Sequence, residues 1–297
     1  MTDRLLGSGL IIVDKPTGMT SHDVISRLRR IFRTRRVGHA GTLDPMATGV
    51  LVVGIERGTR FLAHLVTETK TYRATIRLGA STTTDDAEGN ITSRTDTTDV
   101  TDTLIDAAIA QLTGDIMQKP AAVSAIKIDG KRAHERVRDG ETVDIPARPV
   151  TVHRFDVLDR RSVDGYIDLD VDVFCSSGTY IRSLARDLGN ALGVGGPLTA
   201  LRRTTVGPFD LTHARTLEEL EDNPQLSLTL DQALAASFPI LRVSGEEGHK
   251  LAMGQWLEPR GLKGIHAAVT PDGQAVALVK EKGKRLATVF VARPSTL

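Results

Sequence analysis

Two segments of the chain alternate between apolar and polar residues, which predicts strands that each bury one face. From Thr71 to Leu78, the apolar residues share one face with Tyr72, while threonines and arginines occupy the other. From Tyr166 to Phe174, apolar residues alternate with three aspartates. Both segments are therefore expected to lie in a sheet, with the ring of Tyr72 toward the core.

Two apolar runs, Leu10 to Val13 and Val50 to Ile55, predict further strands. After Thr20 and Ser21 the spacing becomes helical, and either residue is placed to cap the helix. Its apolar positions are Val24, Ile25, Leu28, Ile31 and Phe32. The arginines between these positions are expected to face outward.

Two more helices are predicted, the first from about Asp102 to Leu112, with Gly114 at its end. The second follows the turn Ser176-Ser177-Gly178-Thr179 directly after an alternating strand. Its inward positions are Ile181, Leu184, Leu188 and Leu192. A strand-to-helix turn of this kind directs backbone amides and Arg182 toward an anion.

The character of the chain changes after Phe238-Pro239, where one helix around Glu246 to Trp256 is followed by short strands. The strands are predicted near Ala275 to Val279 and Leu286 to Val291. At 297 residues the chain is about twice a usual domain of ~150 residues. We therefore expect a large domain over 1–238 and a small β-rich domain over 239–297.

Composition is that of an ordinary globular protein, with 40% hydrophobic and 25% charged residues. Lys and Arg total 38 against 37 Asp and Glu, so net charge alone does not indicate a nucleic-acid binder. The single cysteine, Cys175, excludes an intramolecular disulfide and argues against a structural zinc site. A reducing, cytoplasmic location is expected, and the sequence shows neither a membrane span nor a targeting segment.

The charges are nevertheless sorted along the chain, and two segments are basic. The first carries Arg27, Arg29, Arg30, Arg33, Arg35 and Arg36. The second carries Lys127, Lys131, Arg132, Arg136 and Arg138, within an excursion over about 118–150. Such local patches can bind a polyanion, because the field that matters is screened over about 10 Å. An ordinary solvated helix face explains the first patch equally well.

A glycine-containing loop is predicted from Val37 to Thr48, and it holds the densest group of candidate catalytic residues, with His39 and Asp44 close in sequence. Asp44 is the best candidate for a catalytic carboxylate, although Asp-Pro also simply starts turns. His39 has no partners for a metal site. No G-x-S-x-G or phosphate-binding glycine motif is present, so a serine hydrolase and a nucleotide hydrolase lack support.

Gly38-His39, followed by Gly41-Thr42-Leu43-Asp44-Pro45-Met46-Ala47-Thr48-Gly49, closely resembles the catalytic-aspartate signature of the TruB-type tRNA pseudouridine synthases. Further segments resemble family motifs in the family's order. They are Asp14-Lys15-Pro16-x-Gly18-Met19-Thr20-Ser21, Lys70-x-Tyr72-Arg73, Ser124-Ala125-x-Lys127-x-Asp129-Gly130-Lys131-Arg132-Ala133, Gly178-Thr179-Tyr180-Ile181-Arg182-Ser183-Leu184, Leu201-Arg202-Arg203 and Gly207-Pro208-Phe209. The resemblance extends to about residue 210.

The resemblance implies isomerisation of uridine 55 (tRNA numbering) in the T-loop of tRNA, with Asp44 as the essential carboxylate. It implies that Tyr72 stacks on the flipped uracil and that Arg182 forms an ion pair with Asp44. Leu201 would line the apolar wall of the pocket. Lys15 would lie near the aspartate loop, and His39 beside the flipped nucleotide.

The family fold implies an α+β catalytic domain with a central mixed, largely antiparallel sheet flanked by helices and loops. A small C-terminal β-barrel-like domain of the PUA type, which binds RNA, would follow. The implied partner is the T-arm of tRNA, bound by a monomer that needs no metal and no other cofactor. Candidate phosphate contacts are Arg29, Arg30, Lys127, Lys131 and Arg132, each contributing through counterion release.

Physical chemistry agrees with this assignment. A buried carboxylate is driven toward its neutral form, so a reactive Asp44 needs a cationic neighbour, and Arg is always charged. A ring such as that of Tyr72 can stabilise a stacked base by about 1–3 kcal/mol. The uracil must leave its stack, detach at N1 and rejoin at C5, which requires a site closed to water.

The sequence departs from the family pattern in two places. Pro120-Ala121-Ala122-Val123-Ser124 stands where relatives commonly have Pro-Pro-x-Tyr-Ser. Thr82-Thr83-Thr84 replaces a Thr-Asp-Thr run, which makes Asp86 the better match for the acidic position.

Two other functions compete with the synthase. A tRNA-binding folding factor would need little turnover, and hence neither Asp44 nor Arg182. A carboxylate-dependent hydrolase would need a second acidic partner for Asp44. No motif supplies that partner.

Overall fold

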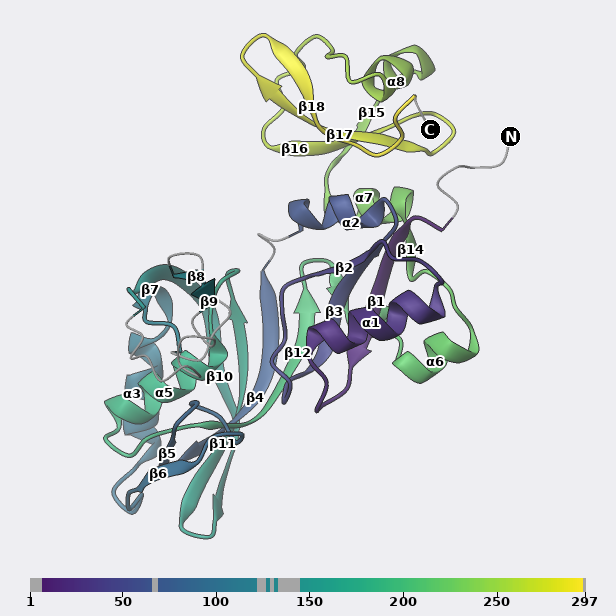
Figure 1. Cartoon of the computed structure of the whole chain (residues 1–297). Helices are drawn as coiled ribbons and strands as arrows, with labels where there is room; N and C mark the ends of the chain where they lie inside the picture. Colours follow the sequence, from purple (N-terminus) through teal and green to yellow (C-terminus); the bar gives the residue numbers. More distant parts are fainter. Residues whose placement is uncertain (1–6, 66–68, 122–126, 129–130, 133–144, 296–297) are drawn as a thin grey trace. The chain divides into compact units, whose positions relative to one another are not determined.

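The computed structural model describes residues 7–65, 69–121, 127–128, 131–132 and 145–295 (Figure 1). The chain forms two compact units. Unit 1 comprises Met1–Val66 and Thr205–Leu297, and unit 2 comprises Thr67–Thr204. The chain passes from unit 2 into unit 1 within strand β12 (Leu198–Val206).

Unit 1 is built on two long apolar strands. β1 (Gly9–Lys15) pairs antiparallel with β3 (Thr48–Ile55) over its whole length. β14 (Leu228–Thr229) pairs with β1. Nearly every residue of β1 and β3 is buried, so the strands predicted from their apolar runs are confirmed.

A short strand, β2 (Val37–Ala40), also pairs antiparallel with β3. The expectation of one loop from Val37 to Thr48 is therefore wrong at its start, and the loop covers only 41–47. Only four residues long and containing Gly38, β2 carries too little apolar pattern to be recognised. Its ladder with β3, a tertiary contact, makes it a strand.

Helix α1 (Ser21–Ile31) begins as predicted because Thr20 caps it. The Thr20 hydroxyl accepts a hydrogen bond from the Asp23 N–H at 3.1 Å, and the Asp23 carboxylate accepts one from the Thr20 N–H at 2.9 Å. Val24, Ile25 and Leu28 are buried. The apolar stripe thus faces the core, as its spacing predicts.

The C-terminal part of unit 1 contains a four-stranded sheet in the order β15-β16-β17-β18 (Figure 1). Its strands are Ile240–Arg242, Ile265–Val269, Ala275–Lys282 and Arg285–Val291, and only the β15–β16 pair is parallel. Helix α8 (Gly245–Ala252) contacts β17 and β18. The predicted helix to Trp256 is wrong at its end, because Gly254 takes a positive φ of 75° and terminates the turn.

A shared core joins this sheet to the rest of unit 1. Helix α2 (Gly58–Phe61) places the ring of Phe61 6.2 Å from that of Phe238 and 6.0 Å from that of Phe290. The Arg57 guanidinium lies over the Phe290 ring and donates to the carbonyl oxygen of Ala292 at 2.6 Å. Unit 1 also contains η1 (Leu62–His64), β13 (Phe209–Asp210), η2 (Leu211–His213), α6 (Leu217–Asp222) and α7 (Leu230–Ser237).

Unit 2 holds strands in the order β12-β4-β11-β10-β7 (Figure 1). The ladders β4–β11, β11–β10 and β10–β7 are antiparallel. The strand bounds are β4 (Lys70–Leu78), β7 (Gly114–Gln118), β10 (Arg148–Val163) and β11 (Tyr166–Cys175). The alternation predicted for β4 and β11 is confirmed, because their apolar residues are buried.

The polar face of these strands carries ion pairs in register. Asp168 lies opposite Arg77 and accepts two hydrogen bonds from its guanidinium, at 2.8 and 2.7 Å. Asp170 accepts from the Thr75 hydroxyl at 2.7 Å. Asp172 pairs with Arg154 of β10, so the three aspartates of β11 are paired across the sheet rather than gathered into an acidic site.

The remaining elements of unit 2 are α3 (Asp102–Gln111), α5 (Ile181–Ala191), and the two-stranded pairs β5–β6 (Ala80–Thr82, Ile91–Arg94) and β8–β9 (Lys127–Ile128, Lys131–Arg132). Both predicted helices are confirmed. The basic excursion predicted over about 118–150 lies mostly outside the described residues. The predicted α+β fold class, with a largely antiparallel sheet and a C-terminal β-sheet region, is confirmed.

Candidate active site

Asp44 lies half-buried on the loop 41–47 between β2 and β3. Glycines with positive φ values flank Asp44, Gly41 at the start of the loop with 75° and Gly49 at the second position of β3 with 99°. Side-chain-bearing residues rarely adopt these angles, so the glycines allow the sharp entry and exit of the chain. A turn in which the Ala47 N–H donates to the Asp44 carbonyl at 3.1 Å closes the loop.

Lys15 supports this loop from the end of β1. Its side chain is completely buried, and Nζ donates to the carbonyl oxygens of Met19 at 2.6 Å, Pro16 at 2.9 Å and Pro45 at 3.2 Å. The Gly18 N–H donates to the same Pro45 carbonyl at 2.8 Å. The ammonium group therefore ties the turn after β1 to the residue that follows Asp44.

Ser21 fixes the other side of the aspartate. Its buried hydroxyl accepts a hydrogen bond from the Leu43 N–H at 2.9 Å and donates one to the Leu43 carbonyl at 3.1 Å. Leu43 is itself 4% exposed. The residues on both sides of Asp44 are thus anchored, and the aspartate is held on a rigid loop.

The other candidates in unit 1 lie around this loop in sequence. His39 is on β2, opposite Val53 of β3, and is half-buried. Arg29 and Arg30, on the last turn of α1, are exposed as predicted. Arg27 departs from the outward arrangement, because its guanidinium donates to the Glu221 carboxylate of α6 at 2.7 and 2.8 Å.

In unit 2, Tyr72 and Leu201 are buried residues of strands. Tyr72 is on β4, opposite Val173 of β11, and is 7% exposed. Leu201 is on β12, the strand that neighbours β4 in the sheet, and is also 7% exposed. An aromatic ring and an aliphatic side chain therefore lie on adjacent strands, as an apolar wall for a planar ligand requires.

Arg182 stands at the start of α5 and is only 5% exposed. Its Nη1 donates to the Thr84 carbonyl at 3.2 Å and lies 3.5 Å from Oδ2 of Asp86. Asp86 is 2% exposed and also accepts hydrogen bonds from the Thr84 hydroxyl and the Glu88 N–H. A buried guanidinium is thus held next to a buried carboxylate.

One helical turn further, Arg186 continues the same arrangement. Its guanidinium lies 3.4 Å from Asp85 and donates to the Lys119 carbonyl at 2.7 Å. Burial is the main reason that the pKa of Asp85 is raised, and the charges of Arg186 and Arg182 oppose that rise. Two arginines of α5 therefore face two consecutive aspartates.

Ser21 and Asp86 have supporting roles that the sequence does not predict. The sequence indicates Ser21 as a possible helix cap and as the last residue of a family motif, and Asp86 as a match to an acidic family position. Their roles depend on Leu43 and Arg182, which are 22 and 96 positions away. Their membership of the motifs was the one available signal.

The described structure brings Lys15 to the Asp44 loop within unit 1, and it places Tyr72, Leu201 and Arg182 in unit 2. The ion pair between Asp44 and Arg182 stays a prediction. Lys127, Lys131 and Arg132 lie on the paired strands β8 and β9. Arg136, Arg138 and the departure at Ala122 to Ser124 lie outside the described residues.

Within the described ranges, no three His, Cys, Asp or Glu side chains gather in a way that could hold a metal ion. Among the helices that the structure describes, none combines the length and apolar character needed to cross a membrane.

Three family models match consecutive stretches of the chain. Residues 29–181 match the TruB family pseudouridylate synthase (N terminal domain), and residues 182–236 match the tRNA pseudouridylate synthase B C-terminal domain. Residues 238–293 match the tRNA Pseudouridine synthase II, C terminal model.

Full-length relatives carry the name tRNA pseudouridine synthase B. The protein of Corynebacterium efficiens is 72% identical over 297 residues, and the match covers 100% of this chain and 100% of that protein. The protein of Nocardia farcinica is 59% identical over 289 residues, which are 97% of this chain and 94% of that protein.

Solved structures of similar fold include two multi-component complexes. A chain of a Cbf5-Nop10-Gar1 complex has a TM-score of 0.74 at 27% identity, covering 98% of this chain and 87% of that one. A chain of an H/ACA RNP bound to a substrate RNA containing 2′-deoxyuridine has a TM-score of 0.72 at 26% identity, covering 96% and 85%.

Proposed function

The chain belongs to the TruB family of pseudouridylate synthases, and from this premise we propose that it converts uridine 55 in the T-loop of tRNA to pseudouridine, with Asp44 as its essential carboxylate. As a tRNA pseudouridine synthase it is an isomerase. The observation that carries the assignment of Asp44 is its anchored loop, in which Ser21 and Lys15 hold the residues on both sides.

The reaction breaks the bond between N1 of uracil and C1′ of the ribose and forms a bond between C5 and C1′. The proton on C5 is lost to solvent, and N1 gains one, so the product is an isomer of the substrate. The carboxylate of Asp44 could act by attack on C1′, by addition to C6 or by removal of a ribose proton. All three routes need an ionised carboxylate at a fixed position.

Tyr72 and Leu201 would receive the base. Both are buried on neighbouring strands of unit 2, and a tyrosine ring stabilises a stacked base by about 1–3 kcal/mol. This stacking offsets part of the cost of flipping the nucleotide, which is a few kcal/mol. His39 would lie beside the flipped nucleotide.

Arg182 would keep Asp44 ionised. A guanidinium is charged at every relevant pH, and a cation within about 4–6 Å favours the charged form of a carboxylate. The side chain is buried and held at Thr84 and Asp86, so it needs little rearrangement to act as a fixed charge.

RNA binding would involve the T-arm and the basic side chains of Arg29, Arg30, Lys127, Lys131 and Arg132. The proposal divides the chain into a catalytic domain over 1–238 and a PUA-type RNA-binding domain over 239–297. The chain would act as a cytoplasmic monomer, in the compartment that holds its tRNA substrate.

Tritium release from an unmodified tRNA transcript labelled at C5 of uridine tests this function, because only C5 of a converted uridine loses its label. The native protein should release tritium and place pseudouridine at position 55. Asp44→Asn should lower the rate at least about a hundredfold while still binding the transcript. Asp106→Asn, which changes an exposed aspartate of α3, should match the native protein.

Two outcomes would contradict the proposal. Pseudouridine at another position would overturn the assignment to uridine 55. Tight binding with no release by the native protein would leave the tRNA-binding folding factor as the function.

A further inference from the structure

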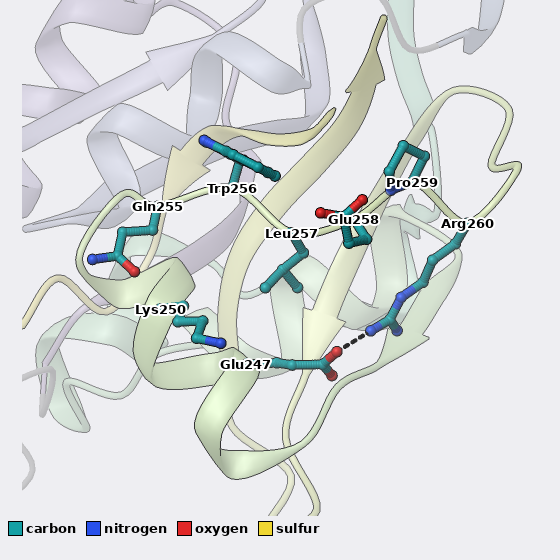
Figure 2. A pocket seen from close by; sticks show the side chains of 8 residues that line it. All are labelled: Glu247, Lys250, Gln255, Trp256, Leu257, Glu258, Pro259 and Arg260. Atoms are coloured by element: carbon teal, nitrogen blue, oxygen red, sulfur yellow. Dashed lines mark hydrogen bonds and ion pairs between the residues drawn. The ribbon is translucent and has the colours of Figure 1, made fainter. Parts of the chain in front are cut away.

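A pocket of about 550 Å³ opens beside helix α8 in the C-terminal part of unit 1 (Figure 2). Residues of α8 and of the loop that follows it form the walls. Trp256 and Leu257 supply the apolar lining, and Lys250, Arg260, Glu247 and Glu258 are the charged residues around them. A cavity of this size and mixed character is suited to a small organic ligand.

The loop that carries Trp256 is fixed by backbone hydrogen bonds. Leu257 and Leu286 of β18 exchange two, at 3.0 and 2.8 Å. The Glu281 carboxylate of β17 accepts from the N–H groups of Arg260 at 2.7 Å and Leu262 at 2.9 Å. Because the loop is tied to two strands, the pocket exists before any ligand arrives.

Trp256 is the only tryptophan in the chain, and it is 45% exposed. The neighbouring Leu257 is buried, so of the two apolar side chains that line the pocket only the indole is exposed to solvent. The Arg285 guanidinium lies 4.9 Å from the centre of the Trp256 rings. An exposed aromatic ring next to a cation is the combination that proteins use to stack unpaired bases.

The charge around the pocket favours a polyanion. Residues 240–297 contain nine Lys and Arg against five Asp and Glu, although the whole chain has a net charge of only +1. Lys282, Lys284 and Arg285 lie at or beside the turn between β17 and β18, and Arg285 reaches Trp256. The local field is therefore positive where the ring is exposed.

Two ion pairs determine which cation of the pocket is available to bind a phosphate group. Lys250 lies 3.2 Å from Glu246, whose side chain is 81% exposed. An ion pair this exposed to solvent is weak, so the Lys250 ammonium group can leave Glu246 and bind a phosphate. Arg260 is paired with Glu247, whose pKa is lowered chiefly by the Ser244 backbone N–H and further by Arg260. Lys250 is thus the more available cation inside the pocket.

We propose that this pocket binds an unpaired nucleotide of the RNA substrate other than the target uridine. The base stacks on Trp256, a base N–H group donates to Glu258, and the adjoining phosphate contacts Lys250. A base inside a duplex has both faces covered and cannot stack in this way, so the site selects single-stranded RNA. The inference rests on the proposed function only in taking tRNA as the natural source of that nucleotide.

Fluorescence of the single tryptophan reports directly on the pocket. Titrating the whole chain with a short single-stranded oligoadenylate should quench the Trp256 emission in a saturable way, and added salt should weaken the effect. A duplex of the same length should leave the emission unchanged. Unaltered emission with both RNAs would overturn the proposal, as would equal quenching by both.

Variants separate stacking from general stability. Trp256→Ala should weaken binding of labelled oligoadenylate by about tenfold, and Trp256→Phe should weaken it less. Met253→Ala is the matched control, because Met253 is on the same loop, is also 45% exposed and does not line the pocket. Equal affinities of Trp256→Ala and the native protein would refute the stacking role.

Turnover of tRNA distinguishes this proposal from the proposed function. Trp256→Ala should raise the KM for tRNA and leave kcat unchanged, since the residue binds RNA away from the reacting base. A native protein that releases tritium while Trp256→Ala keeps the native KM would overturn the pocket alone. A native protein that shows quenching but no release would overturn the synthase function alone.

Discussion

The hydroxyl group of Ser21 accepts a hydrogen bond from the N–H of Leu43 and donates one to the carbonyl oxygen of the same residue, at 2.9 and 3.1 Å. One side chain at the first turn of α1 therefore satisfies both backbone groups of the residue before Asp44. Since both residues are buried, water could not replace these two hydrogen bonds if the hydroxyl group were removed.

Ser21→Ala is expected to lower kcat by about tenfold to a hundredfold, because small displacements of a catalytic group cost rates of this size. KM should change little, since Ser21 is buried and its side chain is not available for contact with RNA. Stability should fall by about 1–3 kcal/mol, the cost of unsatisfied buried groups. Single-turnover kinetics and urea unfolding measure the two effects.

Ser21→Thr keeps the hydroxyl and should restore most of the activity. Ser237→Ala is the control for stability, because the Ser237 hydroxyl oxygen is buried with no hydrogen-bond partner in the described part of the chain. A native kcat in Ser21→Ala would show that the loop is held without this contact.

Asp86→Asn is expected to destabilise the protein by about 3–5 kcal/mol, because it removes one charge from a buried pair with Arg182. The matched control is Asp102→Asn, which removes the partner of Arg160. The Asp102 side chain is 79% exposed, so its loss should cost less than about 1 kcal/mol. If urea unfolding showed that Asp86→Asn and Asp102→Asn lower the unfolding free energy equally, burial would not strengthen the Arg182–Asp86 pair.

Arg29→Ala and Arg30→Ala should each weaken binding to any RNA sequence and reduce the salt dependence of affinity. Each lost phosphate contact should lower the slope of log K against log salt by about 0.7–0.9. Arg27→Ala should leave the slope unchanged, because the Arg27 guanidinium is already paired with Glu221 of α6. Unchanged slopes for all three variants would remove α1 from the RNA footprint.

Cys175 should resist thiol reagents in the folded protein. Burial raises the pKa of its thiol from 9.0 to about 11, so the reactive thiolate is scarce at pH 8. Disulfide-forming dyes should react slowly in buffer and rapidly in urea. Fast reaction of the folded protein at pH 8 would contradict the burial of Cys175.

The same pKa shift predicts how stability depends on pH. The folded state holds the proton more tightly than the unfolded state, so its stabilising effect is complete below pH 9 and is lost as pH rises from 9 to about 11. Comparison with Cys175→Ala isolates this loss from other groups that titrate in the same range. The difference in unfolding free energy between the two proteins should shrink across that interval.

The sequence alone predicted the elements whose apolar residues recur with a regular period. The alternation in β4 and β11 and the helical spacing in α1 and α5 each repeat along one segment, so they reveal the buried face without knowledge of its partner. The motif around Asp44 is also a local signal, because its residues are contiguous in the chain. Fold class, family and the leading candidate for the catalytic carboxylate followed from these signals.

Only the tertiary structure decided which residues hold that site and where a second ligand could bind. β2 became a strand through its ladder with β3, and Ser21 and Asp86 acquired roles through Leu43 and Arg182. The Trp256 pocket likewise depends on β17 and β18 fixing a loop. These contacts join residues far apart in sequence, and they form only because packing brings their elements together, which a local period does not encode.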